Sequence, residues 1–333
     1  MKNLRLIEEE LPGLNPDEVT VGIKAVGLNF ADVAAILGLY RAIPKGSFIP
    51  GLEYSGVVEA VGPEVTGFST GDRVMGISRF GSYTDRINIP FHYLKKIPDT
   101  WSFEEGAAWL VHGLTAYYAL VRLAGIQEGQ TVLIHAGAGG VGLLANRIAK
   151  KFNSFTIGTT RSTGKMEFMK AKGYDAVILR TRNFRNELEE TLDGRPLHIV
   201  LDSIGGQVLK DSFRLMAPEG RLIVYGSASF MPHGFKPSYW RLFVKYLQRP
   251  KIDPMRLPEW NKSVMGFNLI YMYEQKENLK KYLDDLERLQ IGKPYIGHRF
   301  AFDELLNGVR LLQSGKSTGK IVIRVEQKGK SEE

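Results

Sequence analysis

Apolar and polar positions between residues 125 and 225 alternate in blocks that predict a parallel β-sheet with helices between its strands. Such apolar runs alternating with amphipathic helices are typical of a doubly wound parallel α/β domain, in which ligands bind beyond the carboxyl ends of the strands. The runs have the length of buried strands and lie at 132–136, 155–160, 176–179, 198–201 and 221–225.

The flanking regions follow a different pattern. Short alternating segments at 20–26 and 56–61 are separated by glycine-containing turns, which predicts a β-rich, irregular domain in the first hundred residues. Ser102 and Glu105 form a capping box that opens the helical passage into the parallel-sheet region. Towards the C-terminus we expect a strand at 266–273, a helix at 278–289 and a closing strand at 321–325.

A G-x-G-x-x-G motif joins the first apolar run of the parallel sheet to an amphipathic helix. We expect Gly137 to allow the tight turn, Gly139 to let the backbone approach a pyrophosphate, and Gly142 to let the helix pack closely on the sheet. Gly140 is part of the motif, and Val141 begins the helix expected at 141–151, whose N-terminal N–H groups should face the phosphates. Glycine-rich turns are common, but the strand before and the helix after give this motif the context of a dinucleotide site.

Charges after the next strand favour NADPH over NADH. An NAD site would be expected to carry an acidic residue there for the ribose hydroxyls, yet none occurs between Glu128 and Glu167. Arg161, Ser162 and Lys165 follow the strand instead, and their donors suit a 2′-phosphate. The alternative is that the two cations belong to the solvated first turn of a helix.

Later strand ends complete the expected cofactor site. Gly226 and Ser227 are small, so the backbone can approach the cofactor there. Arg180, directly after the strand predicted at 176–179, is also expected to bind the cofactor.

Length and composition limit the remaining possibilities. A chain of 333 residues is long for a single core and suggests two domains. No apolar run reaches the length of a membrane span, and the first residues lack the apolar core of a signal peptide, so we expect a cytoplasmic protein. Cysteine is absent, which excludes disulfides, thiolate metal sites and cysteine nucleophiles.

The net charge of +8 is mostly dispersed, and no nucleic-acid motif occurs, so we expect no nucleic-acid partner. One segment, 235–262, interleaves basic and aromatic residues with only two acids. It could touch a membrane surface or an anionic partner. The interpretation that the sequence favours is a helical flap that covers the active-site cleft with its basic face in water.

The order of the predicted elements along the chain resembles that of the medium-chain dehydrogenase/reductase superfamily, and within it the zinc-free quinone oxidoreductase branch. The stretch 248–269 looks most like the vesicle amine transport protein-like quinone oxidoreductases. The match covers nearly the whole chain and rests on GLNFAD at 27–32, PGLEYSGVVEAVG at 50–62, GLTAYY at 113–118, AGAGGVG at 136–142, DSIGG at 202–206 and GKSTGKIVI at 315–323.

The resemblance implies an α/β protein in which a GroES-like β-rich catalytic domain, formed by residues 1–122 and 263–333, is interrupted by a Rossmann NADP-binding domain at 123–262. It also implies a homodimer that joins the edges of two nucleotide-domain sheets, for which the apolar segment 266–272 is suitable. Family members usually carry a further strand before the segment equivalent to 4–11, so this chain looks short by roughly a dozen residues.

Residue types argue against the zinc site of the related alcohol dehydrogenases. Those enzymes present cysteine and histidine where this chain has Asn29 and Leu52, and neither residue can replace them as zinc ligands. The six histidines show no ligand spacing. Without zinc an alkoxide is hard to stabilise, which favours reduction of a conjugated acceptor over oxidation of an alcohol.

The same resemblance indicates catalytic and cofactor-contacting residues. Asn29 lies where the family places a polar side chain near the nicotinamide, although it could instead cap the helix that begins at the next residue. Tyr40 lies where enoyl-thioester reductases carry a tyrosine proposed as proton donor, although it could be an aromatic lid. Thr115 should contact the nicotinamide carboxamide, and the cofactor cleft should be lined by Phe267 and Leu269. Lys320 is either a further cofactor contact or a surface residue.

The sequence therefore predicts an NADPH-dependent, zinc-independent reductase of quinones or other conjugated carbonyl (enone) acceptors, with its cofactor between the two domains. A 2-enoyl-thioester reductase is the first alternative, in which Tyr40 would be essential. The second is a weakly catalytic, membrane-associated NADPH-binding protein that works through the segment 235–262.

Overall fold

The computed structural model describes residues 4–232, 234 and 237–326, and it divides the chain into two compact units. Unit 1 consists of Met1–Val111, Tyr273–Lys280 and Lys293–Glu333, and unit 2 consists of His112–Met272 and Lys281–Gly292. The chain passes from one unit to the other at residues 111/112, 272/273, 280/281 and 292/293, whereas the predicted boundaries are 122/123 and 262/263.

Packing within unit 2 explains why this division differs from the predicted boundaries. The Tyr117 hydroxyl donates to an Asp285 carboxylate oxygen at 3.0 Å, and a Cβ on Gly113 would lie 2.9 Å from the Leu286 side chain. Helix α3 (Leu110–Tyr117) and the second half of α10 (Lys276–Arg288) thus pack on each other inside unit 2. No strand pattern marks such a helix–helix contact in the sequence.

Unit 1 is built on a seven-stranded sheet in the order β12-β13-β1-β2-β3-β5, with β4 also paired to β1. β13 runs antiparallel to β1 and parallel to β12, so the C-terminal strands complete the sheet that the N-terminal strands begin. The predicted β-rich domain is confirmed, and so is its capping box, because Ser102 and Glu105 exchange hydrogen bonds at the start of α2. The strands are β1 (Glu18–Gly27), β2 (Glu53–Val61), β3 (Arg73–Ile77), β4 (Arg86–Pro90), β5 (Leu94–Lys96), β12 (Ile296–Ala301) and β13 (Lys320–Arg324), and the helices are α1 (Phe30–Ile36), α2 (Phe103–Gly106), α11 (Leu305–Ser314) and the 3-10 turns η1 (Phe91–Tyr93) and η7 (Phe302–Glu304).

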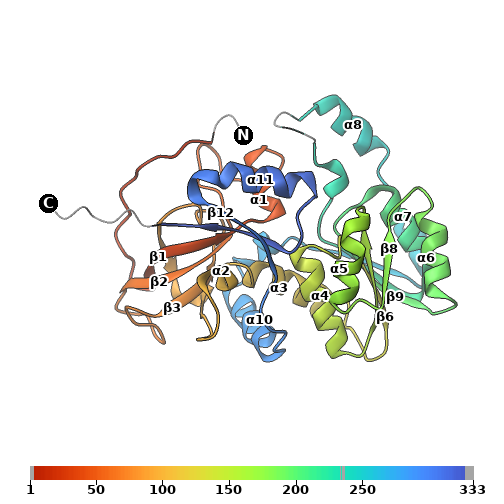
Figure 1. Cartoon of the computed structure of the whole chain (residues 1–333), viewed down its shortest axis with the longest axis horizontal. Coiled ribbons are helices and arrows are strands. Elements are labelled where there is room, and N and C mark those ends of the chain that lie inside the picture. The colour runs from red at the N-terminus through yellow and green to blue at the C-terminus, as the bar shows by residue number, and fades with distance from the viewer. Residues whose placement is uncertain (1–3, 233, 235–236, 327–333) are drawn as a thin grey trace. The chain divides into compact units, whose positions relative to one another are not determined.

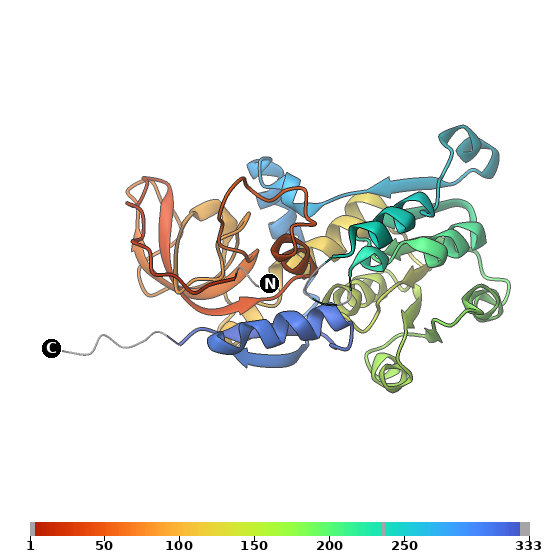
Figure 2. The same ribbon diagram turned by 90° about the horizontal axis from the view of Figure 1, so that it is seen from above.

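Unit 2 contains a six-stranded parallel sheet in the order β11-β10-β9-β6-β7-β8 (Figures 1 and 2). This is the strand order of a Rossmann fold, and it reverses between β6 and β9, where such folds bind their ligands. The predicted strands 155–160 and 176–179 are confirmed at both ends. The strands are β6 (Thr131–Ile134), β7 (Phe155–Thr160), β8 (Ala176–Leu179), β9 (Leu197–Asp202), β10 (Met216–Val224) and β11 (Ser263–Gly266).

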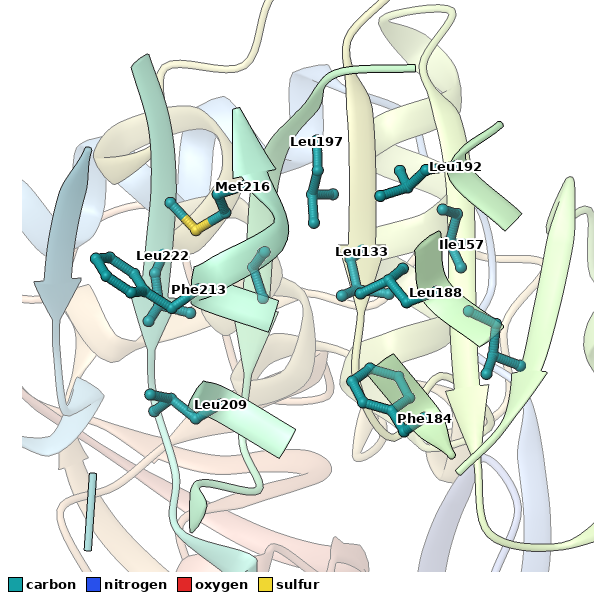
Figure 3. Close-up of a cluster of buried hydrophobic side chains, with 12 residues drawn as sticks. Leu133, Ile157, Phe184, Leu188, Leu192, Leu197, Leu209, Phe213, Met216 and Leu222 are labelled. Carbon is teal, nitrogen blue, oxygen red and sulfur yellow. The ribbon is translucent and has the colours of Figure 1, made fainter. Parts of the chain in front are cut away.

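Helices cover both faces of the unit 2 sheet, with α4 and α5 on one face and α6 and α7 on the other (Figure 1). The core under α6 and α7 is apolar, and it joins Leu133, Leu197 and Leu222 of the strands to Phe184, Leu188 and Phe213 of the helices (Figure 3). The helices of this unit are α3, the π-helical turn η2 (Tyr118–Leu123), α4 (Gly140–Lys151), α5 (Met166–Ala171), α6 (Phe184–Leu192), α7 (Gly206–Leu215), α8 (Tyr239–Leu247), α9 (Leu257–Trp260) and the 3-10 turns η3 (Thr163–Lys165), η4 (Ala228–Phe230), η5 (Pro254–Arg256) and η6 (Leu269–Met272).

Two expectations near the end of unit 2 need comment. The predicted strand at 266–273 is wrong, because β11 ends at Gly266 and the apolar residues after it form the turn η6. Residues 235–262 are helical in part, as α8, η5 and α9, although 235 and 236 lie outside the described residues. Within the part of the chain that the structure describes, no helix is both long enough and apolar enough to cross a bilayer.

Candidate active site

The glycine-rich turn after β6 has a geometry that the sequence only partly predicts. Ala136, not Gly137, takes the left-handed conformation, with φ of 52°. Gly137 is needed for another reason: a Cβ there would lie 2.6 Å from the Met169 side chain and 3.0 Å from the Tyr174 hydroxyl. That hydroxyl donates to the carbonyls of Gly137 at 3.1 Å and Gly142 at 2.8 Å, so Tyr174 fixes the turn from behind. Gly137 therefore allows the tight turn by leaving space for Met169 and Tyr174, and not by adopting a left-handed conformation.

The remaining glycines of the motif make room around the start of α4. A Cβ on Gly142 would come within 2.8 Å of the backbone of residues 136 and 137, which confirms the close packing of helix on turn. Gly139, the N-cap of α4, is less crowded, since a Cβ there would meet one atom, the Ala136 carbonyl oxygen at 3.3 Å. Gly140 is required by a residue that the sequence did not indicate, because a Cβ there would lie 2.0 Å from Nδ1 of His112. The α4 N-terminus beside Gly139 and Val141 can therefore accept an anion at short range.

Three cations gather beyond the ends of β7 and β8. Arg161 is exposed, whereas Lys165 and Arg180 are half-buried. Burial, and secondarily the Arg161 charge, lowers the pKa of Lys165 and lowers the pKa of Arg180 to about 10, with Asp202 opposing the latter shift. The buried Nε of Arg180 makes no hydrogen bond within the described residues. The mutual repulsion and the unused donor both suit a bound anion. Ser162, beside them, is exposed and donates its backbone N–H to the Thr160 hydroxyl at 3.1 Å.

The loops that follow β9 and β10 lie close to each other. Burial raises the pKa of Asp202 to about 6, although its carboxylate accepts from the N–H groups of Ile204 and Gly205, each at 2.9 Å. A Cβ on Gly226 would lie 3.1 Å from the Ser203 carbonyl oxygen, so a larger residue there would be tightly packed. Ser227 is the next residue and precedes η4.

Other predicted contacts lie elsewhere in unit 2. The Phe267 ring packs against Tyr118 and Tyr225, with centroid distances of 5.0 Å and 6.1 Å. Leu269 begins η6, and Thr115 is buried in α3. Their contact with a cofactor stays a prediction.

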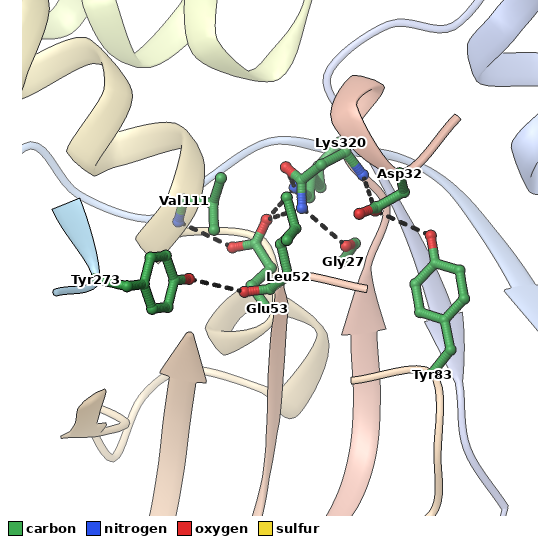
Figure 4. A network of polar contacts seen from close by, with 9 residues as sticks. Gly27, Asp32, Leu52, Glu53, Tyr83, Val111, Tyr273 and Lys320 are labelled. Atoms are coloured by element: carbon green, nitrogen blue, oxygen red, sulfur yellow. Dashed lines mark hydrogen bonds and ion pairs between the residues drawn. The ribbon is translucent and has the colours of Figure 1, made fainter. Parts of the chain in front are cut away.

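Unit 1 holds a buried ion pair between Lys320, at the start of β13, and Glu53, at the start of β2 (Figure 4). Each side chain is 1% exposed. The Lys320 ammonium also donates to Oδ1 of Asn29 at 2.8 Å, and the backbone N–H of Val111 donates to the second Glu53 oxygen at 3.1 Å. Burial lowers the pKa of Lys320, and Glu53 opposes that shift. The surface alternative for Lys320 is therefore wrong.

Asn29 is the N-cap of α1, but its side chain turns into the ion pair. Its amide donates to Glu53 at 3.0 Å and to the Gly27 carbonyl at 3.2 Å. Both amide protons are thus in use inside the protein. The helix start is capped instead by Asp32, whose carboxylate accepts a hydrogen bond from the Asn29 backbone N–H at 2.8 Å. Gly27 allows this arrangement, because a Cβ there would lie 2.0 Å from the Ala107 carbonyl oxygen.

Asp32 is a buried carboxyl with unequal oxygens. Oδ2 accepts from the Asn29 N–H and from the Tyr83 hydroxyl at 2.9 Å, whereas Oδ1 is buried and has no hydrogen-bond partner within the described residues. Burial raises the pKa of Asp32 to about 7, against the opposing hydrogen bonds and the Lys320 charge. Burial therefore favours the protonated form of this carboxyl.

These residues do not fit a zinc ion. Leu52 is buried and offers no ligand atom, and the Asn29 amide oxygen already accepts from an ammonium. A cation at that distance would repel a metal ion held by the same oxygen. Among the described residues, no group of three or more His, Cys, Asp or Glu side chains could hold a metal ion.

Sequence reasoning missed Glu53, Asp32 and Tyr83. A usable signal was present, because Glu53 is an acid at the first position of a mostly apolar strand and Lys320 is a base at the first position of another. Charges in buried strands are almost always paired, so the two could have been matched. Tyr40 is half-buried, and its ring lies edge-on to Phe80 at a centroid distance of 6.4 Å.

Family models match both parts of the chain. The model described as "Alcohol dehydrogenase GroES-like domain" matches residues 15–99, and the model described as "Zinc-binding dehydrogenase" matches residues 140–287. The first match falls in unit 1 and most of the second falls in unit 2.

Curated relatives are similar along nearly the whole chain. The synaptic vesicle membrane protein VAT-1 homolog of Danio rerio is 34% identical over 96% of this chain and 66% of its own length. The VAT-1 homolog of Homo sapiens is 31% identical over 94% of this chain and 80% of its own length. The quinone oxidoreductase-like protein 2 homolog of Nematostella vectensis is 32% identical over 94% of this chain and 83% of its own length.

Solved structures share the fold. Mycobacterial Rv1454c complexed with NADPH has a TM-score of 0.83 and 28% identity, covering 97% of this chain and 96% of that one. Pseudomonas syringae quinone oxidoreductase has a TM-score of 0.80 and 30% identity, covering 96% and 94%. The CurK enoyl reductase has a TM-score of 0.80 and 28% identity, covering 97% and 95%.

Proposed function

The chain belongs to the medium-chain dehydrogenase/reductase superfamily, among its VAT-1 and quinone oxidoreductase-like members, and on that premise we propose that it is an NADPH-dependent, zinc-independent reductase of quinones or other conjugated carbonyl acceptors. When bound, the dinucleotide supplies the hydride, and the protein binds, orients and desolvates the reactants.

The cation cluster of Arg161, Lys165 and Arg180 is the observation that carries the proposal. An NADH site needs an acceptor for ribose hydroxyls, but here two half-buried cations and one exposed cation repel one another. A dianionic 2′-phosphate would relieve that repulsion and take up the unused Arg180 donor. The NADPH complex of the mycobacterial neighbour supports the same cofactor.

Reduction of a conjugated acceptor fits the chemistry of the residues in unit 1. Asn29, Lys320 and Glu53 form a polar network that does not fit zinc, so an alcohol substrate would lack the Lewis acid that stabilises an alkoxide. Addition of hydride to a quinone or enone places charge on an oxygen that hydrogen-bond donors can stabilise. The catalytic roles of Asn29, Tyr40 and Thr115, and the cofactor contact of Lys320, are part of this proposal.

A 2-enoyl-thioester reductase is the second candidate, favoured by the CurK enoyl reductase neighbour and by Tyr40. A phenol can protonate the enolate that forms when hydride adds to an enoyl thioester. The packing of Tyr40 against Phe80 equally suits an aromatic lid.

A substrate screen with NADPH tests both candidates. The wild type and Tyr40→Phe should be assayed on quinones, enones and crotonyl thioesters, with Tyr93→Phe as a matched tyrosine control in the same unit. The main proposal predicts quinone or enone turnover that survives Tyr40→Phe. Turnover of thioesters alone, abolished by Tyr40→Phe but not by Tyr93→Phe, would establish the second candidate instead.

We also propose that the chain forms a homodimer and acts in the cytoplasm. β11 is the edge strand of the unit 2 sheet, which is where a second copy could extend it. Sedimentation analysis of a proline substitution at Val264 in this strand would test the dimer, since proline removes an edge hydrogen bond.

A further inference from the structure

The turn between β6 and α4 contains a residue with strained backbone. Ala136 has a φ of 52°, a left-handed conformation that few residues other than glycine adopt. Such a conformation costs free energy and persists only where the surrounding contacts impose it. The same turn leads into Gly139 and the N-terminus of α4, which can accept an anion. The contacts that hold Ala136 in place therefore affect the shape of the candidate phosphate site.

Thr159, in β7, contacts both neighbours of Ala136. Its carbonyl oxygen accepts a hydrogen bond from the backbone N–H of Gly137 at 3.0 Å, and its hydroxyl lies 2.9 Å from Nδ1 of His135. The backbone N–H of His135 donates to the Leu201 carbonyl oxygen of β9 at 3.1 Å. The residues before and after Ala136 are thus each fixed to a neighbouring strand of the sheet.

The His135 ring is hydrogen-bonded through both of its nitrogens. Nε2 lies 2.9 Å from the Ser212 hydroxyl of α7, and the side chains of His135, Thr159 and Ser212 belong to residues that are each 0% exposed. Ser212 uses its single proton to donate to the Val208 carbonyl oxygen at 2.8 Å, so towards His135 it accepts. Nε2 therefore carries the ring proton, and Nδ1 accepts from the Thr159 hydroxyl.

The ring is neutral, and its orientation is set by hydrogen bonds. Burial, and secondarily the Arg180 charge, lowers the pKa of His135 to about 3. A neutral imidazole has one donor and one acceptor, which match one hydroxyl that accepts and one that donates. Protonation would place a second N–H against the Thr159 hydroxyl, which would then have to give up its role as donor. His135 therefore has the chemistry of a fixed support and not that of a proton carrier.

We propose that His135 is a positioning residue of the dinucleotide site, and that the histidine clamp of His135, Thr159 and Ser212 holds Ala136 in the conformation that receives the pyrophosphate. The inference rests on the proposed binding of NADPH. A ligand that needs one conformation of a turn binds more weakly in proportion as that conformation is less populated. Loosening the clamp should therefore weaken the contacts made to the pyrophosphate and spare those made to the 2′-phosphate.

Substitutions of Thr159 test the clamp with little change in side-chain size. Thr159→Val removes the hydroxyl, and we expect it to raise the Kd for NADPH by about tenfold in calorimetric titration. Thr159→Ser keeps the hydroxyl and should restore a Kd within about twofold of the wild-type value. Thr131→Val is the matched control, because Thr131 is a buried threonine at the end of β6 away from the turn. His135→Leu removes both hydrogen bonds of the ring and should bind at least as weakly as Thr159→Val.

A comparison of two ligands separates positioning from a general loss of structure. Adenosine 2′-monophosphate carries the 2′-phosphate but no pyrophosphate, so Thr159→Val and His135→Leu should bind it as the wild type does. Leu192→Ala, at the last residue of α6, removes a buried side chain of the core and should lower stability without changing the Kd for either ligand. Equal weakening of both ligands by Thr159→Val would show a general structural role and would overturn the proposal.

Hydrogen exchange of the ligand-free protein gives a readout that needs no nucleotide. The backbone N–H groups of residues 136–142 should exchange about tenfold faster in Thr159→Val than in the wild type or in Thr159→Ser. An unchanged Kd for NADPH in Thr159→Val, or unchanged exchange at these residues, would overturn the proposal and leave the proposed function intact. Failure of the wild type to bind NADPH would overturn both.

Discussion

The two units each contain a cluster of charges, and the clusters are opposite in kind. In unit 1 the Lys320 ammonium meets the Glu53 carboxylate and the Asn29 amide, all of them buried. In unit 2 the cations Arg161, Lys165 and Arg180 lie close together, and the Arg161 charge lowers the pKa of both Lys165 and Arg180. The first cluster pairs a cation with an anion, whereas in the second cluster the cations repel one another.

The comparison shows that charged side chains can stabilise the fold in one place and bind a ligand in another. A buried ion pair in which every charge is matched holds neighbouring groups in place, and it is costly to break from one side only. A set of cations that repel one another favours the binding of an anion. The attraction between a phosphate and each cation offsets the repulsion between the cations. Substitutions should therefore damage stability in unit 1 and cofactor selection in unit 2.

The largest effect is expected from Lys320→Met, which leaves the Glu53 carboxylate buried without its counter-ion. We expect the free energy of unfolding to fall by about 3–5 kcal/mol, measured by urea denaturation. Arg324→Met is the matched control, since this residue lies on the same strand but pairs with Glu104 at the surface. Combining Lys320→Met with Glu53→Gln should recover part of the loss. A loss no larger than that of Arg324→Met would contradict a structural role for the pair.

A second effect concerns pH. The Asp32 carboxyl has an ordinary pKa of 3.8 and a folded pKa of about 7, so between these values the unfolded chain releases a proton that the folded chain keeps. Rising pH therefore favours unfolding, and the contribution is fully present below pH 3.8 and lost above pH 7, by up to about 4 kcal/mol. Asp32→Asn should remove this dependence.

The measurement is the unfolding free energy of the wild type and Asp32→Asn across that pH range. The difference between the two proteins isolates Asp32 from the other carboxyls. A difference that stays constant with pH would show that Asp32 does not titrate there.

A smaller and more local effect is expected in unit 2. Arg180→Met should raise the Kd for NADPH by roughly 10–100-fold, as expected for the loss of a hydrogen bond between charged groups, and leave the Kd for NADH and the unfolding free energy nearly unchanged. Arg185→Met, on the exposed surface of α6, is the control. Equal weakening of both nucleotides would mean that Arg180 supports the site in general and does not read the phosphate.

The sequence predicts the parallel sheet of unit 2 well, because its buried strands are apolar runs that only a parallel sheet accommodates. The sequence predicts strand bounds less well where a strand contains both buried and exposed residues. β10 begins at Met216, five residues before the predicted start, because its first half contains Pro218, Glu219 and Gly220. The apolar segment after Gly266 forms η6 and not a strand, since apolar periodicity alone does not distinguish the two.

Site residues follow the same rule. The cations after β7 are readable from the sequence because they are local to one strand end. The partnership of Glu53 with Lys320 is not, because 266 residues separate the two and only the sheet pairing of the N- and C-terminal strands brings them together. The left-handed Ala136 was missed because glycine is the default expectation at such a position.

The most direct test of the account is a calorimetric titration of the full chain with NADPH and with NADH at one ionic strength. The three neighbouring cations of unit 2 predict that NADPH binds at least about tenfold more tightly than NADH, a difference of about 1.4 kcal/mol, and that added salt reduces this difference. Equal affinities, or no binding of either nucleotide, would contradict it.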